Sequence, residues 1–320
     1  MYNTHLQYLA NHTEPSIRYM YLTGYAGKEN SDPMVVSAKE SVRLSPTVKS
    51  MLAPRSEDGR LLFHAYSKWR GAFWTLLQLV DLGYPSGDPI LAPLFDQCYE
   101  WLLEPERLKK IPLIDGRYRR CALQESGTVF SAVRLGKIDS RVEQLVDLLL
   151  KWQWPDGGWN CDKKPQAHHS SFYESLIPLR GMNAYALATG DPRVKKSTER
   201  VSELFLQHHL YKRSTDGTAI SEAFTRLAFP AYWHYDFLMG LIGMDEVGRL
   251  DDPRCKEALD LLENKQLSDE GFAAEAKYFV TNQNAASGVS PINWGTANPK
   301  KRNDFITVRA LGILKKVGRI

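Results

Sequence analysis

The chain has 320 residues, of which 43% are hydrophobic and 24% charged, which is the composition of a globular protein large enough to bury a substantial core. Its net charge is only +4 and its basic runs are short, which argues against a nucleic-acid-binding surface. No stretch approaches the roughly 20 apolar residues of a membrane span, and residues 1–15 lack the pattern of a signal peptide, so we expect a cytoplasmic protein without a transmembrane segment.

Two kinds of turn signal alternate along the chain. Asp-Gly turns recur about every 50 residues, at 58–59, 115–116, 156–157, 216–217 and 269–271. Breaks rich in Gly and Asp lie between them, and in three of these breaks Asp88, Asp191 and Asp252 precede a proline. An Asp N-cap followed by Pro at the first helical position is a helix-start signal. The chain therefore predicts a repeat of two helices joined by two different turns.

The two helices of each repeat differ in their apolar pattern. Helices after the breaks mix apolar spacing with charges, which predicts one buried face, over residues 90–103, 141–152, 194–208 and 253–263. Helices after the Asp-Gly turns are apolar nearly all round, which predicts burial on all sides, over residues 69–82, 122–135, 172–188, 233–244 and 305–317. Among the N-terminal helices, we expect residues 16–24 to form a sixth buried helix and residues 42–52 its outer partner. Residues 4–10 are expected to form an outer helix that packs against the last buried helix and closes a ring. No stretch shows the period-two alternation of a strand, and residues 278–303 are expected to form a long loop.

Alternating buried and half-exposed helices predict two concentric rings, an all-α (α/α)6 toroid in a single domain spanning residues 1–320. The turn WPDGGW (154–159) resembles the inter-helix turn of the terpene cyclases and protein prenyltransferases, which are α/α toroids. The run GGWNCDKKP, followed by SSFYESL and LRGM, is similar to a segment of the prenyltransferase β-subunit. The whole chain also resembles a group of bacterial cyclase-like proteins. These resemblances imply the toroid fold and an isoprenoid-like ligand.

The catalytic motifs of these families are not carried over. The DxDD acid motif of class II cyclases and the DDxxD motif that binds diphosphate through magnesium are both missing from the sequence. The resemblance to prenyltransferases places their three zinc ligands at Glu125, Gly127 and Glu174, so two of the three ligand types differ.

In a toroid, the first turns of the inner helices converge on one mouth. The side chains expected there are aromatic with a few charges, which is the composition of a ligand pocket, and they predict a substrate-binding set of Trp69, Arg70, Trp74, Phe172, Tyr173, Trp233 and Tyr235. The alternative is that these aromatic residues fill a core that holds no ligand.

Four titratable residues near this mouth are candidate catalytic groups. Glu125, Glu174 and Asp236 occupy comparable first-turn positions on three inner helices, where carboxylates can act as general acid and base. The alternative is that they only complement helix N-termini. His234 is the candidate imidazole, against the alternative of a histidine packed in an aromatic core.

The sequence favours a protein without a cofactor, and zinc is the alternative. The four cysteines form no CxxC pair and are expected to be reduced. Cys121 and Cys161 follow successive turns, and His168 or His169 comes soon after Cys161. Zinc binds thiolates, imidazole and carboxylate, so Cys121, Cys161 and His169 are the candidate ligands.

Three functions remain open. The first is a cyclase- or prenyltransferase-like protein that binds or transforms an apolar, isoprenoid-like small molecule. The second is a carbohydrate-active lyase or hydrolase, since (α/α)6 toroids also host those activities, and it requires two carboxylates across an open groove. The third is a non-catalytic scaffold or binding protein. The oligomeric state is left open.

Overall fold

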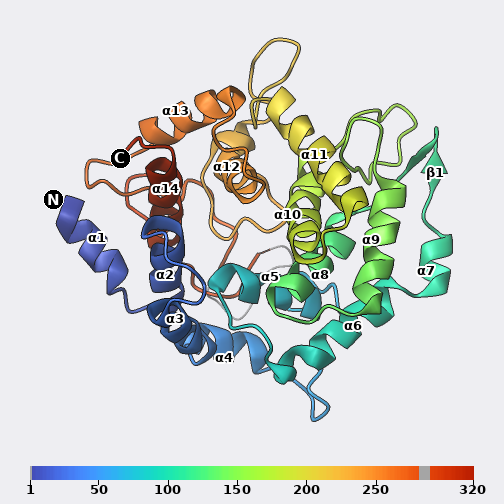
Figure 1. Ribbon diagram of the computed structural model, residues 1–320, viewed down its shortest axis with the longest axis horizontal. Helices are drawn as coiled ribbons and strands as arrows, with labels where there is room; N and C mark the ends of the chain where they lie inside the picture. Colours follow the sequence, from blue (N-terminus) through green and yellow to red (C-terminus); the bar gives the residue numbers. More distant parts are fainter. Residues whose placement is uncertain (1, 281–288) are drawn as a thin grey trace.

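The structure, a computed structural model, describes residues 2–280 and 289–320 (Figure 1). Helices dominate it, so the expected all-α class is confirmed. In chain order the elements are α1 (Tyr2–Ala10), α2 (Pro15–Met20), η1 (Tyr21–Tyr25), α3 (Pro33–Arg43), α4 (Pro46–Leu52), α5 (Ala72–Leu82), η2 (Pro89–Leu91), α6 (Ala92–Leu102), α7 (Pro105–Lys109), β1 (Leu113–Ile114), β2 (Arg117–Tyr118), α8 (Leu123–Arg134), α9 (Ser140–Trp152), α10 (Phe172–Thr189), α11 (Pro192–Gln207), η3 (Glu222–Thr225), α12 (Phe237–Glu246), η4 (Pro253–Cys255), α13 (Lys256–Asn264) and α14 (Asp304–Lys316).

A two-stranded hairpin is the one β-sheet among the described residues. β1 and β2 pair antiparallel, with Leu113 opposite Tyr118 and the predicted Asp115-Gly116 turn between them. Two residues per strand are too few to produce a period-two alternation, so the sequence pattern could not indicate them. None of the described helices combines the length and the apolar character needed to cross a membrane.

The predicted helix-start signals are confirmed. The carboxylates of Asp88, Asp191 and Asp252 each accept a hydrogen bond from the backbone N–H two residues later, at 2.9–3.0 Å, and a proline occupies the next position. Each cap therefore satisfies a backbone N–H that the first turn leaves without a partner.

The helices that the sequence predicts to be buried contact one another in a closed series. α5 contacts α8, α8 contacts α10, α10 contacts α12, α12 contacts α14, α14 contacts α2, and α2 contacts α5. The amphipathic helices pack outside this series, with α3 on α2, α6 on α5, α9 on α8, α11 on α10 and α13 on α12 (Figure 1). α1 lies beside the start of α14, where the Tyr8 hydroxyl donates to the Asp304 carboxylate at 3.0 Å.

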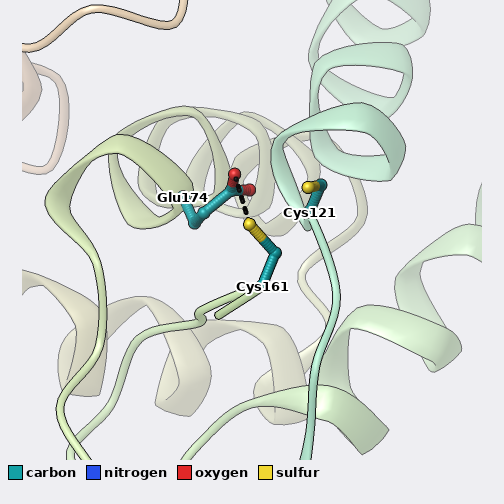
Figure 2. Close-up of side chains that lie close together, drawn as sticks. All are labelled: Cys121, Cys161 and Glu174. Atoms are coloured by element: carbon teal, nitrogen blue, oxygen red, sulfur yellow. Dashed lines mark hydrogen bonds between the residues drawn. The ribbon is translucent and has the colours of Figure 1, made fainter. Parts of the chain in front are cut away.

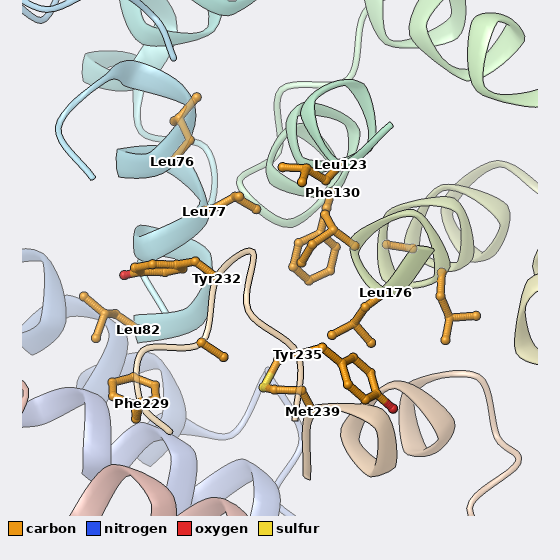
Figure 3. Packing of buried hydrophobic residues seen from close by; sticks show 14 of the residues in the cluster. Leu76, Leu77, Leu82, Leu123, Phe130, Leu176, Phe229, Tyr232, Tyr235 and Met239 are labelled. Atoms are coloured by element: carbon orange, nitrogen blue, oxygen red, sulfur yellow. The ribbon is translucent and has the colours of Figure 1, made fainter. Parts of the chain in front are cut away.

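An irregular segment, residues 226–236, enters the interior between the buried helices. The sequence predicts that a helix begins at 233, but α12 begins only at Phe237, after the N-cap Asp236. In this segment the Tyr232 ring lies 4.3 Å from that of Trp69, and the Phe229 ring stacks 4.4 Å from that of Phe305. Figure 3 shows Tyr232 and Phe229 among apolar side chains of the buried helices. Aromatic side chains thus fill the space on which the buried helices converge.

The described parts of the predicted loop 278–303 are tied to this core. Trp294 is 1% exposed, donates its indole N–H to the Ser290 hydroxyl at 2.8 Å, and packs edge-on against Phe229 and Phe305. Asn303 then caps α14 by accepting a hydrogen bond from the Ile306 N–H. Residues 281–288 lie outside the described part.

Gly181 gives the first testable prediction, because it allows α10 to approach α8 closely. A Cβ at residue 181 would lie 2.5 Å from the Ser126 carbonyl oxygen in α8. We expect Gly181→Ala to lower the free energy of unfolding by roughly 1–3 kcal/mol in chemical denaturation. Gly24→Ala is the control, since a Cβ there would meet no heavy atom within 4 Å. Equal effects of the two substitutions would contradict this view of the α8–α10 contact.

Candidate metal centre

Two cysteines and one glutamate meet at the N-terminal ends of α8 and α10. Cys121 lies just before α8, Cys161 lies in the loop after the WPDGGW turn, and Glu174 is in the first turn of α10. One ligand atom from each of the three lies within 4.8 Å of those of the other two. The Cys161 Sγ is 3.5 Å from the Glu174 Oε1, and Figure 2 shows both thiols directed toward the carboxylate. Among the described side chains this is the one such group of three metal-binding residues.

The WPDGGW turn holds Cys161 at this place. The Asp156 carboxylate accepts hydrogen bonds from the backbone N–H and the hydroxyl of Ser170, at 2.7 and 2.6 Å, which ties the turn to the residues before α10. Gly157 has φ +102°, and a Cβ on Gly158 would lie 2.4 Å from the Ser175 hydroxyl. Both glycines are therefore required by the geometry of the turn, the first by its backbone angle and the second by its contact with α10.

The backbone on the other side is fixed as well. The Arg120 N–H donates to the Asn160 carbonyl at 3.1 Å, which holds the residue before Cys121 against the residue before Cys161. The two thiols are thus brought together by main-chain contacts rather than by a short sequence motif.

Burial and mutual hydrogen bonding shift the pKa values of all three groups. Burial, with the neighbouring Cys161 acting in the same direction, raises the pKa of Glu174 to about 8. The Cys121 thiol donates a hydrogen bond to the Cys161 sulfur, which lowers the pKa of Cys161 to about 6. The same bond raises the pKa of Cys121, because Cys121 retains the shared proton. The site therefore stabilises one thiolate.

The donor set and its spacing fit a zinc ion. Thiolates and a carboxylate are zinc ligands, and a tetrahedral zinc at about 2.3 Å from each sulfur keeps its ligand atoms roughly 3.5–4 Å apart. The ligand atoms of this group need to approach by about 1 Å or less to reach that geometry. Cys121 and Cys161 are only partly buried, so a fourth position can face a ligand.

His169, the third member of the sequence-predicted metal set, is not part of this group. The side chain of His169 is exposed, and its carbonyl oxygen accepts a hydrogen bond from the Asn160 side chain at 2.8 Å. His168 is also exposed and lies 3.5 Å from the Asp115 carboxylate. Glu174 stands beside the two thiols instead.

Ser171 and Glu174 have the spacing of a capping box, in which their side chains would bond to the first backbone N–H groups of α10, but they do not form one. Ser171 is the N-cap residue of α10, but its side chain makes no capping hydrogen bond. The Glu174 carboxylate lies beside Cys161 and near the Leu123 N–H, 3.5 Å away. Glu174 therefore belongs to the cluster of thiols and carboxylate and not to a capping box.

The other two candidate carboxylates have structural partners. The Glu125 side chain is fully buried, and its Oε1 accepts hydrogen bonds from Arg120 at 2.9 Å and from Arg107 at 3.3 Å. Both Asp236 oxygens accept backbone N–H bonds, from Ala228 at 3.0 Å and from Met239 at 2.9 Å. Asp236 thus caps α12, as the alternative of acidic residues at helix N-termini expects, whereas Glu125 pairs with arginines.

His234 lies outside the thiol cluster. Its ring stacks on that of Tyr278, with centroids 3.6 Å apart, and contacts Trp233. Burial, with the nearby Lys68 acting in the same direction, lowers the pKa of His234 to about 4. The imidazole is therefore neutral near pH 7.

The predicted substrate-binding residues divide into three groups. Trp69, Trp74 and Trp233 pack on one another, with ring centroids 5.0–6.1 Å apart. Phe172 and Tyr235 pack edge-on in a second aromatic group, with centroids 5.1 Å apart. Arg70 and Tyr173 are exposed. The buried indole N–H groups of Trp69 and Trp74 have no hydrogen-bond partner among the described residues, and such groups call for a partner.

Tyr66 and Gln124, which the sequence analysis did not select, connect the aromatic group to the thiol cluster. The Tyr66 ring lies 5.5 Å from that of Trp74, and the pKa of Tyr66 is raised to about 12, chiefly by burial. Gln124 hydrogen-bonds to Tyr66 and accepts bonds from Arg107 and Arg120. No motif marks these residues, because the chain brings them together only through the turns before α5 and α8.

Comparison with known proteins finds no relative of this chain. No protein-family model matches the chain, and no curated protein or solved structure is significantly similar to it.

The buried cap Asp236 gives a prediction about pH. Burial raises the pKa of Asp236 to about 6 from its ordinary value of 3.8, so the folded state binds this proton more tightly than the unfolded state does. The stabilisation linked to this proton is complete below about pH 4 and is lost as pH rises through about 6. The unfolding free energy of wild type minus that of Asp236→Ser should fall by roughly 1–3 kcal/mol between pH 4 and 7.

Asn303→Ser is the matched control, because Asn303 caps α14 with a neutral side chain. Its difference from wild type should stay constant over the same pH range. A pH-independent difference for Asp236→Ser would contradict a raised pKa at this position.

Proposed function

We propose that the chain is an (α/α)6 toroid of the terpene cyclase and prenyltransferase-like class that binds zinc through Cys121, Cys161 and Glu174. On this proposal it binds or transforms a small molecule with an apolar part at that zinc. The observation that carries the proposal is the convergence of two thiols and one buried carboxylate at the same ends of two neighbouring buried helices. The closed series of contacts among α2, α5, α8, α10, α12 and α14, each with an outer partner, supports the toroid.

The surroundings of the cluster suit a centre that keeps one ligand position for a substrate. A zinc ion with three protein ligands supplies a Lewis acid at its open position. Glu174 is 7% exposed and Cys161 is half-buried, so the protein shields the carboxylate and leaves access from the thiol side. Arg120 is fixed by Glu125 directly beside Cys121 and contributes a positive charge that favours thiolate over thiol.

The aromatic group supports an apolar part in the ligand. Tyr66 connects Trp74 to the cluster, and apolar or cationic groups pack well on such rings. These features favour a small molecule over a polymer.

The carbohydrate-active alternative receives less support. That chemistry requires two free carboxylates facing a groove. Glu125 is held by two arginines and Asp236 by two backbone N–H groups, which leaves Glu174 as the one candidate carboxylate beside a nucleophile. The zinc experiment described next also tests the scaffold alternative, because a wild-type chain without zinc affinity would favour it.

Zinc stoichiometry tests the proposal. Protein purified without a metal-affinity column, loaded with zinc and dialysed, should retain about one zinc ion per chain. Cys121→Ala, Cys161→Ala and Glu174→Gln should each lower zinc affinity at least about tenfold, because each removes a ligand. Metal content is measured by elemental analysis, and affinity by competition with a chromogenic chelator.

Two variants serve as matched controls. Cys98→Ala removes a buried thiol outside the cluster, and His169→Ala removes the imidazole that the sequence analysis selected. Both should retain zinc with wild-type affinity. Wild-type protein without zinc affinity would refute the metal centre and favour the scaffold, whereas loss of zinc in His169→Ala would restore the sequence-predicted ligand set.

A further inference from the structure

A cavity lies at the ends of α8 and α10 opposite the thiol cluster. It has a volume of about 620 Å³, which is within the usual range for small-molecule sites. Its walls come from the C-terminal halves of α5, α8, α10, α12 and α14, together with α2 and η1. α8 has 12 residues, so its two ends are roughly 18 Å apart. The cavity shares no residue with the proposed zinc centre.

Basic side chains outnumber acidic ones around this cavity. The charged residues that line it are Lys39, Arg134, Arg180, Arg309 and Lys316 against Asp81, Asp245 and Glu246. Two pairs are complete, because Lys316 contacts Asp245 at 2.5 Å and Arg180 forms a two-pronged bond to Glu246 at 2.8 and 2.9 Å. The other three basic residues that line the cavity have no carboxylate within hydrogen-bond distance in the described part of the chain. They are Arg134, Arg309 and Lys39.

Arg309 is the deepest of these three cations. Its side chain is 13% exposed and lies over the ring of Phe229 at 4.6 Å. The nearest carboxylate, Asp81, is 3.9 Å away and also lies 3.5 Å from Arg180. Within the described part of the chain, the Arg309 guanidinium makes one hydrogen-bond contact, with the Met239 sulfur at 3.7 Å. A guanidinium has five donors, so Arg309 is a buried cation without an oxygen acceptor among the described residues.

Arg134 and Lys39 stand nearer the entrance. Arg134 lies 3.9 Å from Glu246, a carboxylate already bound by Arg180. The Lys39 ammonium donates to the Asn30 side chain at 2.8 Å. Burial lowers the pKa of Lys39, and the charge of Arg134 lowers it further, so the two cations face a common space.

Compensation of helix dipoles does not account for this arrangement. Cations near helix C-termini interact favourably with the last carbonyl groups, which explains Arg134 in the last turn of α8 and Lys316 at the end of α14. Arg309 is in the middle of α14, more than one turn from its end, where the dipole effect has faded.

We propose that this cavity binds a small molecule with a phosphate or carboxylate group and a short apolar body. Arg309 binds the anionic group at the inner end, with Arg134 and Lys39 toward the entrance. Arg180 is held in place by Glu246 and lines the same cavity. Phe130, Ile242 and Val308 also line the cavity and contact the apolar part.

Calorimetry on the full chain with four probes tests this site. Hexyl phosphate and hexanoate share an apolar body and differ in the anionic group, while 1-hexanol lacks the charge and inorganic phosphate lacks the body. At least one of the two amphiphilic anions should bind more tightly than both 1-hexanol and inorganic phosphate, and the stronger of the two identifies the anionic group. Equal binding of 1-hexanol, or no binding of either anion at millimolar concentration, would overturn the proposal.

Variants locate the binding. Arg309→Met keeps the apolar stem of the side chain over Phe229, and Arg134→Gln removes a charge at a position that is 44% exposed and tolerant of change. Each should weaken binding of the preferred anion roughly tenfold. Lys315→Gln removes the same charge from α14 outside the cavity and should leave the affinity unchanged. Unchanged affinity in both Arg134→Gln and Arg309→Met would refute the site. Cys161→Ala is a separate control, and it should keep anion binding whether or not it binds zinc.

Discussion

The close approach of α10 to α8 sets the geometry of both sites. Gly181 faces the Ser126 carbonyl so closely that a single added carbon would collide with it. This contact places the start of α10 beside the start of α8, and there Glu174 meets the two thiols. It also places the two helices side by side at their other ends, where Arg180 and Arg134 line the cavity. A change in the α8–α10 spacing would therefore alter both ends of the molecule.

The filling of the interior explains why the sites lie at the ends. Residues 226–236 insert Phe229 and Tyr232 among the buried helices, where they pack against Trp69 and Phe305. Aromatic rings of this size bury much apolar surface and leave little space for a ligand between the two ends. Polar groups are consequently displaced toward the ends, where ligands, ions or water can satisfy them.

Much of the helical framework is predictable from local patterns. The Asp-Pro caps and the contrast between apolar and amphipathic helices indicate which helices are buried, because both depend on residues within one or two turns. Start positions were less predictable: α12 begins four residues later than expected, since the sequence does not show that Asp236 caps the helix while residues 226–236 turn inward.

The composition of the sites was predicted only in part. The sequence analysis placed Cys121 and Cys161 in one candidate metal set with His169, which follows Cys161 closely in the chain, and the structure groups the two thiols with Glu174. The side chain of His169 is exposed and its carbonyl oxygen accepts a hydrogen bond from Asn160, so His169 lies outside the group of thiols and carboxylate. Glu174 comes beside the two thiols from α10. The cavity at the C-terminal ends was missed altogether, because Arg134, Arg180 and Arg309 lie on separate helices and read as ordinary charges in the sequence.

The most direct measurement is X-ray absorption at the zinc edge on the zinc-loaded wild-type chain. Two sulfur ligands at about 2.3 Å and two lighter ligands at about 2.0–2.2 Å would be the signature of a centre formed by Cys121, Cys161, Glu174 and one exchangeable ligand. Replacement of Cys161 by Ala should leave at most one sulfur in the spectrum of any zinc still bound. A shell of oxygen and nitrogen alone in the wild type would contradict the assignment of the two thiols as zinc ligands.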